Sequence, residues 1–218
     1  MPTILSIQKQ SFFPTDSDYL DAAHYLGYKK ANPPEAQIFD LIKAGCNQLF
    51  EVITPKAVYD CFDLSIEKES PETSETSNPT SQRPKISFAD VNLYSQSLVI
   101  NLKDCSKVFL AAVTIGPQVD ALIRRTQSLD SVKASILQAA GAMFAEKTIC
   151  FVNDQIKQTA AEQNTKCKPR FSPGYGDVDL AVQKDFFRLL PCAKIGLSLM
   201  DTMIMSPEKS ITAFIGMI

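Results

Sequence analysis

The segment from Arg170 to Asp177, with the sequence RFSPGYGD, holds the residues best suited to binding a small charged ligand. A proline followed by a glycine favours a tight turn, because proline fixes its own φ and glycine accepts a positive φ. Glycine also leaves backbone N–H and C=O groups open to a ligand. Arg170 offers a planar guanidinium that matches a carboxylate, and Tyr175 offers a flat ring with a hydroxyl group. This combination indicates a site for a small zwitterionic ligand with an aromatic part.

Glu146 is a second candidate, in a segment whose spacing predicts a long helix. It follows Met143 by three residues and Ala139 by seven, which places it on or beside the packed face of that helix. A carboxylate there needs a polar partner, and it could accept hydrogen bonds from ribose hydroxyls or from an ammonium group. Both candidates keep a structural alternative: a solvated helix charge for Glu146, and a turn that caps a helix starting near Asp179 for RFSPGYGD.

The six cysteines and the single histidine, His24, form no pattern typical of a metal site. No two cysteines make a C-x-x-C pair, and a zinc or iron–sulfur site needs clustered ligands on short turns. Free buried thiols in a reducing compartment are the simpler interpretation. A Ser–His–Asp triad would have to use His24, and no nucleophile motif accompanies it. We therefore expect no metal and no catalytic residue in the chain.

The elements that must position these residues mix helices and strands without regular βαβ alternation, which favours an α+β fold. The spacing predicts helices over 16–28, 35–49, 118–126, 130–157 and 180–190, and strands over 52–64, 93–102, 107–115, 195–205 and 211–217. The run KVFLAAVTI at 107–115 is typical of a central strand.

One stretch, at about residues 67–85, reads EKESPETSETSNPTSQRPK and contains no large apolar side chain. Such a segment cannot bury apolar surface, so we expect a flexible polar insertion at the tip of a hairpin. The remaining sequence shows no break of this kind. We therefore expect one domain over residues 1–218 that carries this insertion.

The composition argues against two classes of protein. The 218 residues carry a formal net charge of −2, whereas binding to nucleic acid calls for a concentrated basic surface. No apolar run reaches the roughly 20 residues that a membrane span requires, and the first residues show no secretory signal. The sequence therefore predicts a cytoplasmic protein that binds neither nucleic acid nor membrane.

The RFSPGYGD segment and its surroundings resemble the activation, or reactivation, domain of cobalamin-dependent methionine synthase. In that family an arginine precedes a Pro-Gly-Tyr turn, and a helix, a glycine with a strand, and a proline before a small-residue strand follow. The matching residues here are Arg170, Pro173-Gly174-Tyr175, Gly196, Pro207 and Ser210.

Three further stretches resemble the short, free-standing branch of that family: HYLGY at 24–28, VFLAAVTIGPQVDALIRR at 108–125 and GAMFAEK at 141–147. The similarity therefore extends over nearly the whole chain outside residues 67–85. One departure is Gly176, at a position where methionine synthases usually carry proline.

The resemblance implies a twisted antiparallel sheet with flanking helices, and it implies that the chain binds S-adenosylmethionine. Arg170 would bind the methionine carboxylate. Ser172 and Gly174 would contribute mainly backbone contacts, and Tyr175 would pack or hydrogen-bond at the ligand. Glu146 matches the glutamate that the family carries on its helix.

The activity implied by the resemblance is the reductive methylation of cob(II)alamin on methionine synthase or a related corrinoid methyltransferase. The partner would carry the cobalamin, and a flavodoxin or ferredoxin would supply the electron, so the chain would be a component of methionine synthase activity rather than an independent enzyme. Two alternatives are a non-catalytic docking module for a corrinoid protein and a small-molecule methyltransferase. The latter class usually has a glycine-rich loop in a doubly wound sheet, and no such loop occurs here.

Overall fold

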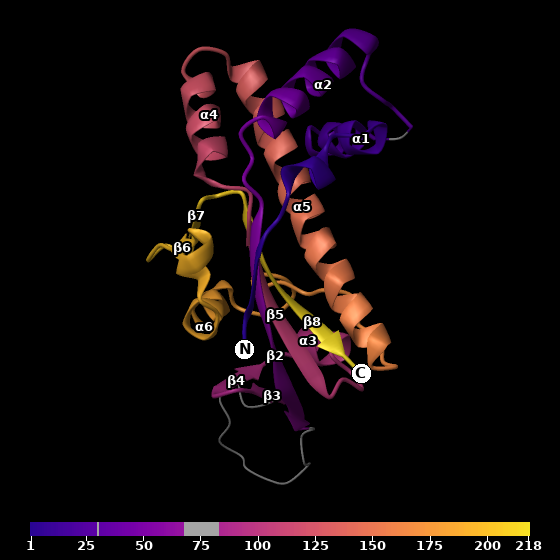
Figure 1. The fold of residues 1–218 in the computed structure, drawn as a ribbon, viewed down its shortest axis with the longest axis vertical. Helices are drawn as coiled ribbons and strands as arrows, with labels where there is room; N and C mark the ends of the chain where they lie inside the picture. The colour runs from indigo at the N-terminus through magenta and orange to yellow at the C-terminus, as the bar shows by residue number, and fades with distance from the viewer. Residues whose placement is uncertain (30, 68–82) are drawn as a thin grey trace.

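The computed structural model describes residues 1–29, 31–67 and 83–218, and it shows a helical part stacked on a sheet part (Figure 1). The α-helices are α1 (Asp16–Tyr25), α2 (Ala36–Phe50), α3 (Gln96–Asn101), α4 (Pro117–Gln127), α5 (Ser131–Glu162) and α6 (Gln183–Leu189). Short 3-10 helices are η1 (Lys9–Phe12), η3 (Leu180–Val182) and η4 (Cys192–Ile195). Helices α1, α2 and α4 form the helical part, and α5 runs from there along the sheet.

The main sheet is antiparallel at every pairing. The strands are β1 (Thr3–Ser6), β2 (Lys56–Glu67), β3 (Lys85–Phe88), β4 (Val91–Tyr94), β5 (Lys107–Thr114), β6 (Ser198–Leu199), β7 (Met205–Ser206) and β8 (Ser210–Met217). Their order is β4-β3-β2-β5-β8, with β1 beside β2, while β6 and β7 form a separate small hairpin. This arrangement confirms the expected α+β fold with an antiparallel sheet and flanking helices. It does not have the parallel order of a doubly wound methyltransferase.

Apolar clusters cover both faces of the sheet. On one face, Phe109 and Ile215 pack against Ile149 and Val152 of α5. On the other face, residues of β5 and β8 pack against α3 and α6. Strand β5 lies between β2 and β8 and is covered on both sides, which explains its uninterrupted apolar sequence. A third cluster joins α1, α2 and α4 to the first half of α5.

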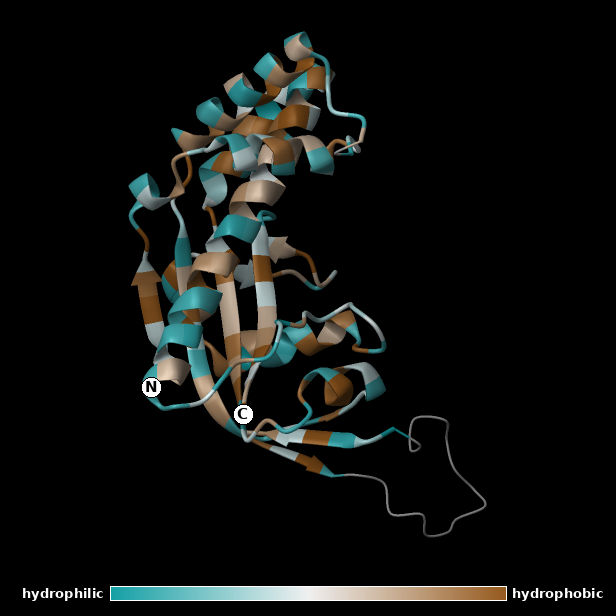
Figure 2. Ribbon diagram, turned by 90° about the vertical axis from the view of Figure 1, so that its right-hand side faces the viewer, coloured by the Kyte–Doolittle hydropathy of each residue, from teal (hydrophilic) through white to brown (hydrophobic). Residues whose placement is uncertain are grey.

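The molecule is curved when it is seen from the side (Figure 2). The helical part and the far end of the sheet project to the same side, so the ribbon bends around an open, concave side. Helix α5 connects the two parts as a single helix of 32 residues, which fixes their relative placement.

Two predicted strands are wrong. Over 93–102 the chain forms only the end of β4 and then turns into α3. The reason is a helix cap: the Ser95 hydroxyl accepts a hydrogen bond from the Leu98 N–H at 3.0 Å. Over 195–205 the chain forms the end of η4 and then the four-residue pairing of β6 with β7. There Gly196 adopts a φ of 75°, which interrupts an extended strand.

The other predicted helices and strands match observed elements to within about five residues, whereas strands β1 and β3 were not predicted. The insertion expected at 67–85 falls mostly on residues 68–82, which lie outside the described residues. At its two ends Glu67 of β2 pairs with Lys85 of β3, so the insertion joins two neighbouring strands. Within the described ranges, no helix is long and apolar enough to cross a membrane.

Candidate functional site

The RFSPGYGD segment forms the predicted turn at the edge of the sheet. The Tyr175 N–H donates to the Ser172 carbonyl at 3.3 Å, and Gly174 inside this turn has a φ of 86°. Phe171 and Phe214 of β8 exchange two backbone hydrogen bonds, of 2.9 and 2.7 Å. The turn is therefore attached to β8 at its beginning, and Tyr175 projects from it with 69% of its surface exposed.

Arg170 and Glu146 form an ion pair although they are 24 positions apart. The distance between Arg170 Nη2 and Glu146 Oε2 is 2.6 Å, and the Cys150 thiol lies 3.8 Å from the same nitrogen. Both charged side chains are partly buried. Among the described residues, the Nε and Nη1 groups of Arg170 have no hydrogen-bond acceptor. The guanidinium therefore keeps donors for a second carboxylate.

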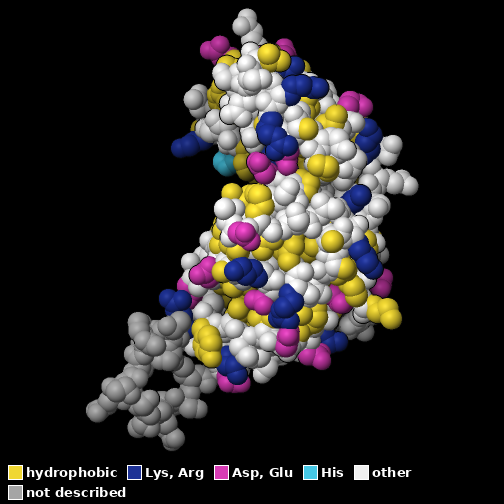
Figure 3. Space-filling view, turned by 90° about the vertical axis from the view of Figure 1, so that its left-hand side faces the viewer, with side chains coloured by type: hydrophobic (Ala, Val, Ile, Leu, Met, Phe, Trp, Pro, Cys, Tyr) yellow, Lys and Arg dark blue, Asp and Glu magenta, His cyan; other side chains and the backbone are white. Residues whose placement is uncertain are grey.

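A pocket of about 500 Å³ opens beside this ion pair, between α1 and α5. Figure 3 shows the surface indented between the helical part and the sheet part, with the histidine side chain at the edge of the indentation. The pocket is lined by Asp18, Asp21, His24 and Tyr25 of α1, and by Met143, Glu146, Lys147 and Cys150 of α5.

The charges around this pocket are mostly negative. Asp18, Asp21 and Glu146 contribute three carboxylates, while Lys147 contributes one ammonium group and pairs with Asp18. Burial, together with the negative charges of Glu146 and Asp21, raises the pKa of Tyr25. The same side chain also lies within electrostatic range of Arg170 and Tyr175. Arg170 connects the pocket to the turn, because it pairs with Glu146 of the pocket and begins the RFSPGYGD segment. The carboxylates of the pocket favour a ligand that carries positive charge.

Asp18 fixes the position of α1 on α5. Its Oδ2 accepts hydrogen bonds from Lys147 Nζ at 2.5 Å and from the Thr15 N–H and hydroxyl at 2.7 Å each. Burial disfavours the charged carboxylate, but the hydrogen bonds from Lys147 and Thr15 outweigh that effect and lower the pKa of Asp18. The position of α1, which forms one wall of the pocket, therefore depends on the ionised form of Asp18.

Replacing Asp18 with asparagine is expected to lower the free energy of unfolding by about 1–3 kcal/mol at neutral pH. Because the pKa of Asp18 in the folded state is below the ordinary value of 3.8, the stabilisation is complete above pH 3.8 and is lost as the pH falls through the folded value. Urea unfolding at several pH values should show that the difference in free energy of unfolding between wild type and Asp18→Asn becomes smaller in acid. The matched control is Asp16→Asn, at an exposed position in the same helical turn. A difference that stays constant into acid would contradict this role of Asp18.

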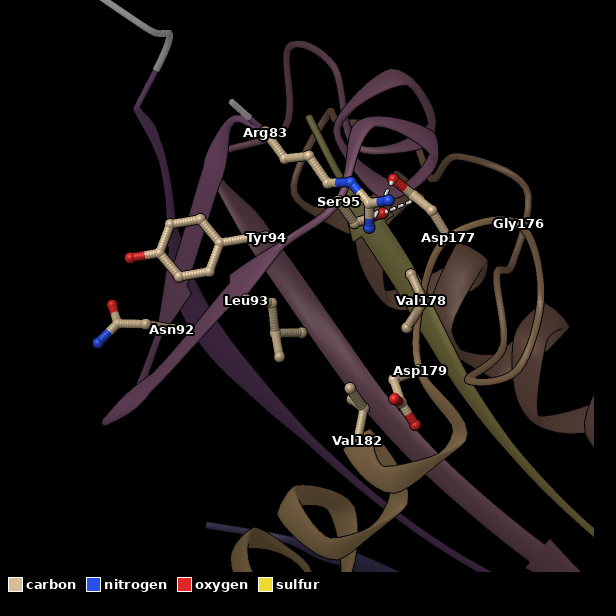
Figure 4. Close-up of a pocket in the computed structure, with 10 residues that line it drawn as sticks. All are labelled: Arg83, Asn92, Leu93, Tyr94, Ser95, Gly176, Asp177, Val178, Asp179 and Val182. Atoms are coloured by element: carbon tan, nitrogen blue, oxygen red, sulfur yellow. Dashed lines mark hydrogen bonds and ion pairs between the residues drawn. The ribbon is translucent and has the colours of Figure 1, made fainter. Parts of the chain in front are cut away.

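A second pocket, of about 540 Å³, lies on the other side of the turn, between β4 and residues 176–179 (Figure 4). Its charged groups already have partners. Asp177 pairs with Arg83 at 3.7 Å, and Asp179 caps η3 by accepting a hydrogen bond from the Ala181 N–H at 2.8 Å. The expected cap near Asp179 is thus present. This pocket offers a ligand fewer open charged groups than the pocket beside Arg170.

Of the five residues predicted to bind a ligand, the structure brings Arg170 and Glu146 into direct contact. Ser172, Gly174 and Tyr175 form the neighbouring turn, and their contacts with a ligand stay predictions.

Of the eight residues that line this pocket, only Glu146 was predicted as a site residue, and Asp21, Tyr25 and Cys150 are among the seven that were not. A four-residue spacing relates Asp21 to Tyr25 and Glu146 to Cys150, so each pair lies on one helix face. Nothing in the sequence showed that these two faces meet.

No family model matches the sequence, and no curated protein matches it. A solved structure does match, that of the MetH reactivation domain bound to AdoHcy, with a TM-score of 0.65 and 13% sequence identity. The superposition covers 99% of this chain and 78% of the other. The chain therefore has the fold of the MetH reactivation domain, as the sequence resemblance implied.

Proposed function

We propose that this chain binds S-adenosylmethionine and supports the reductive methylation of cob(II)alamin on methionine synthase or a related corrinoid methyltransferase. The observation that carries the proposal is the pocket beside Arg170, whose guanidinium is held by Glu146 and keeps donors for a ligand carboxylate. The fold adds support, because the matching reactivation domain was solved with AdoHcy.

The charges of S-adenosylmethionine fit this pocket. The ligand has one carboxylate, which Arg170 binds through its remaining N–H groups. Its ammonium and sulfonium groups carry two positive charges, and Asp21 and Glu146 face them with carboxylates. The rings of Tyr25 and Tyr175 provide flat faces for a sulfonium or for adenine. Ser172 and Gly174 contribute backbone groups of the turn.

S-adenosylmethionine supplies an electrophilic methyl group, which moves to the reduced cobalt of the partner's corrinoid while S-adenosylhomocysteine is left behind. The residues of this chain bind and orient the donor, and we assign no acid, base or nucleophile to them. The pocket opens at the indentation seen in Figure 3, which would keep the methyl group within reach of a partner. An external flavodoxin or ferredoxin would supply the electron that reduces cob(II)alamin before the methyl transfer.

The direct test combines calorimetry with a reactivation assay. Calorimetry first establishes whether the chain binds S-adenosylmethionine. The chain, the ligand and a reductant are then added anaerobically to a corrinoid partner in the cob(II)alamin state, and the absorbance of methylcobalamin should recover. Lack of recovery with confirmed ligand binding would count against the reactivation role. Binding to the corrinoid partner without binding of S-adenosylmethionine would instead indicate a docking module.

S-adenosylmethionine is expected to protect Cys150 from alkylation by iodoacetamide. Cys150 is the exposed cysteine among the six, and it lines the pocket next to Arg170. At a ligand concentration about ten times the dissociation constant, mass action predicts labelling about tenfold slower. Peptide mass spectrometry measures the rate at mildly alkaline pH, because partial burial raises the pKa of this thiol.

Cys61 on β2 is the internal control, since it lies outside the pocket and its labelling rate should not change. Equal labelling of Cys150 with and without saturating ligand would place the ligand elsewhere.

A further inference from the structure

Asp177 connects the end of the RFSPGYGD segment to the start of α3. Its Oδ1 accepts hydrogen bonds from the Ser95 hydroxyl at 2.5 Å and from the Ser97 N–H at 3.1 Å, and its Oδ2 accepts one from the Gln96 N–H at 2.9 Å. Figure 4 shows the Asp177 carboxylate directed toward Ser95. One side chain thus satisfies three donors on an element that lies 82 positions earlier in the sequence.

Gly176 gives a second, independent indication of this close contact. A Cβ atom at Gly176 would lie 2.6 Å from the Ser97 hydroxyl oxygen and 2.8 Å from Ser97 Cβ, and Gly176 has a φ of 56°. The backbone therefore approaches α3 too closely for a side chain. This also explains why the chain lacks the proline that methionine synthases usually carry here, since proline would hold φ at about −65°.

The turn is consequently held at both ends, and in its middle the Gly174 N–H donates to the Val178 carbonyl at 3.0 Å and the Val178 N–H donates to the Tyr175 carbonyl at 3.1 Å. Phe171 is bonded to β8 at one end, and Asp177 is bonded to α3 at the other. Between these anchors lie Ser172, Gly174 and the exposed Tyr175. Burial disfavours the charged form of Asp177, but the hydrogen bonds from Ser95, Gln96 and Ser97 hold its pKa well below the usual range. The anchor to α3 is therefore ionised at neutral pH.

We propose that Asp177 is a positioning residue: it fastens the binding turn to α3 and so fixes Tyr175 and the backbone of residues 172–175 against the ligand. This inference rests on the proposed function. Asp177 itself does not line the pocket beside Arg170; it lines the second pocket, and its carboxylate is bound to α3. Its effect on the ligand is transmitted through the conformation of the turn.

The test compares Asp177→Asn with Asp130→Asn in the full chain. Asparagine keeps the shape of aspartate but turns an NH₂ group toward N–H donors, so the turn should loosen and the affinity for S-adenosylmethionine should fall about tenfold in calorimetry. Asp130 caps α5 by accepting a hydrogen bond from the Lys133 N–H at 2.9 Å, about four helical turns before Glu146. It is therefore the same substitution at another aspartate that accepts a backbone N–H at the start of a helix, placed away from the site.

Two further measurements keep the test decisive. Amide hydrogen exchange over residues 172–176 should accelerate in Asp177→Asn and stay unchanged in Asp130→Asn, and this readout requires no ligand. Gly176→Ala should also loosen the turn, through contact with Ser97 and strain at a positive φ. If Asp177→Asn fails to fold, the affinity of Gly176→Ala decides the question.

The outcomes separate the two proposals. If the wild-type chain binds no S-adenosylmethionine, the proposed function fails and the positioning role falls with it. If the wild type binds and Asp177→Asn binds equally well, or loses no more affinity than Asp130→Asn, the positioning role alone is overturned. Weaker binding with faster exchange confined to the turn would support it.

Discussion

Replacing Arg170 with alanine is expected to raise the dissociation constant for S-adenosylmethionine roughly 30- to 150-fold. A charge-assisted hydrogen-bonding pair of this kind contributes about 2–3 kcal/mol, and alanine removes the whole guanidinium. The substitution also leaves the Glu146 carboxylate without the partner that lies 2.6 Å away in the wild type. Calorimetry measures the affinity, and thermal unfolding verifies that the variant stays folded.

The matched control is Arg188→Ala. Arg188 on α6 is also an ion-paired arginine, since it contacts Asp90 at 2.5 Å and Asp185 at 3.2 Å, but it does not line the pocket beside Arg170. Its replacement should leave the affinity unchanged. Arg170→Lys keeps the charge without the planar fork, so its affinity should fall between those of wild type and Arg170→Ala. If Arg170→Ala binds S-adenosylmethionine with wild-type affinity, the guanidinium takes no part in binding.

Replacing Phe214 with alanine should cause the largest loss of stability, about 3–5 kcal/mol. Phe214 on β8 is fully buried and makes edge-to-face contacts with Phe186 at 4.7 Å and Phe88 at 5.8 Å between ring centroids. Its removal leaves a cavity where β8, α6 and β3 meet. For a chain of this size the melting temperature should fall by roughly 6–20 °C in a calorimetric scan.

Phe13→Ala is the control for this change, because Phe13 is 63% exposed and its main ring contact is with Phe50. It should cost about 1 kcal/mol or less. Alanine keeps the backbone groups that residue 214 uses to bond Phe171, so the attachment of the turn to β8 should persist in the folded variant. A melting temperature within the range of Phe13→Ala would show that the cluster around Phe214 repacks without a cavity.

The two predictions address separate parts of one arrangement. Glu146 lines the pocket and pairs with Arg170 beside it, while Phe214 and Asp177 hold the adjoining turn on the sheet and on α3. A rigid scaffold of this kind is what the proposed binding of S-adenosylmethionine requires.

The sequence by itself determined the elements whose signal is local. The apolar run at 107–115 became β5, and the apolar spacing of 36–50 and 131–162 became α2 and α5, because burial of a helix face or a strand leaves its period in the residues themselves. The Pro-Gly pair likewise determined the turn before Tyr175, since only glycine accepts the positive φ without strain. The ordered set of motifs also indicated the fold of the reactivation domain.

Only the tertiary structure decided which of these elements meet. Helix α3, which Ser95 caps locally and which replaced a predicted strand, is bound in addition by Asp177 from 82 positions away. The pairing of Arg170 with Glu146 follows from the attachment of Phe171 to β8, which packs against α5. The addition of Asp21 and Tyr25 to the pocket follows from the packing of α1 on α5. Contacts between distant segments depend on how whole faces pack together, and that packing leaves no periodic trace in either segment alone.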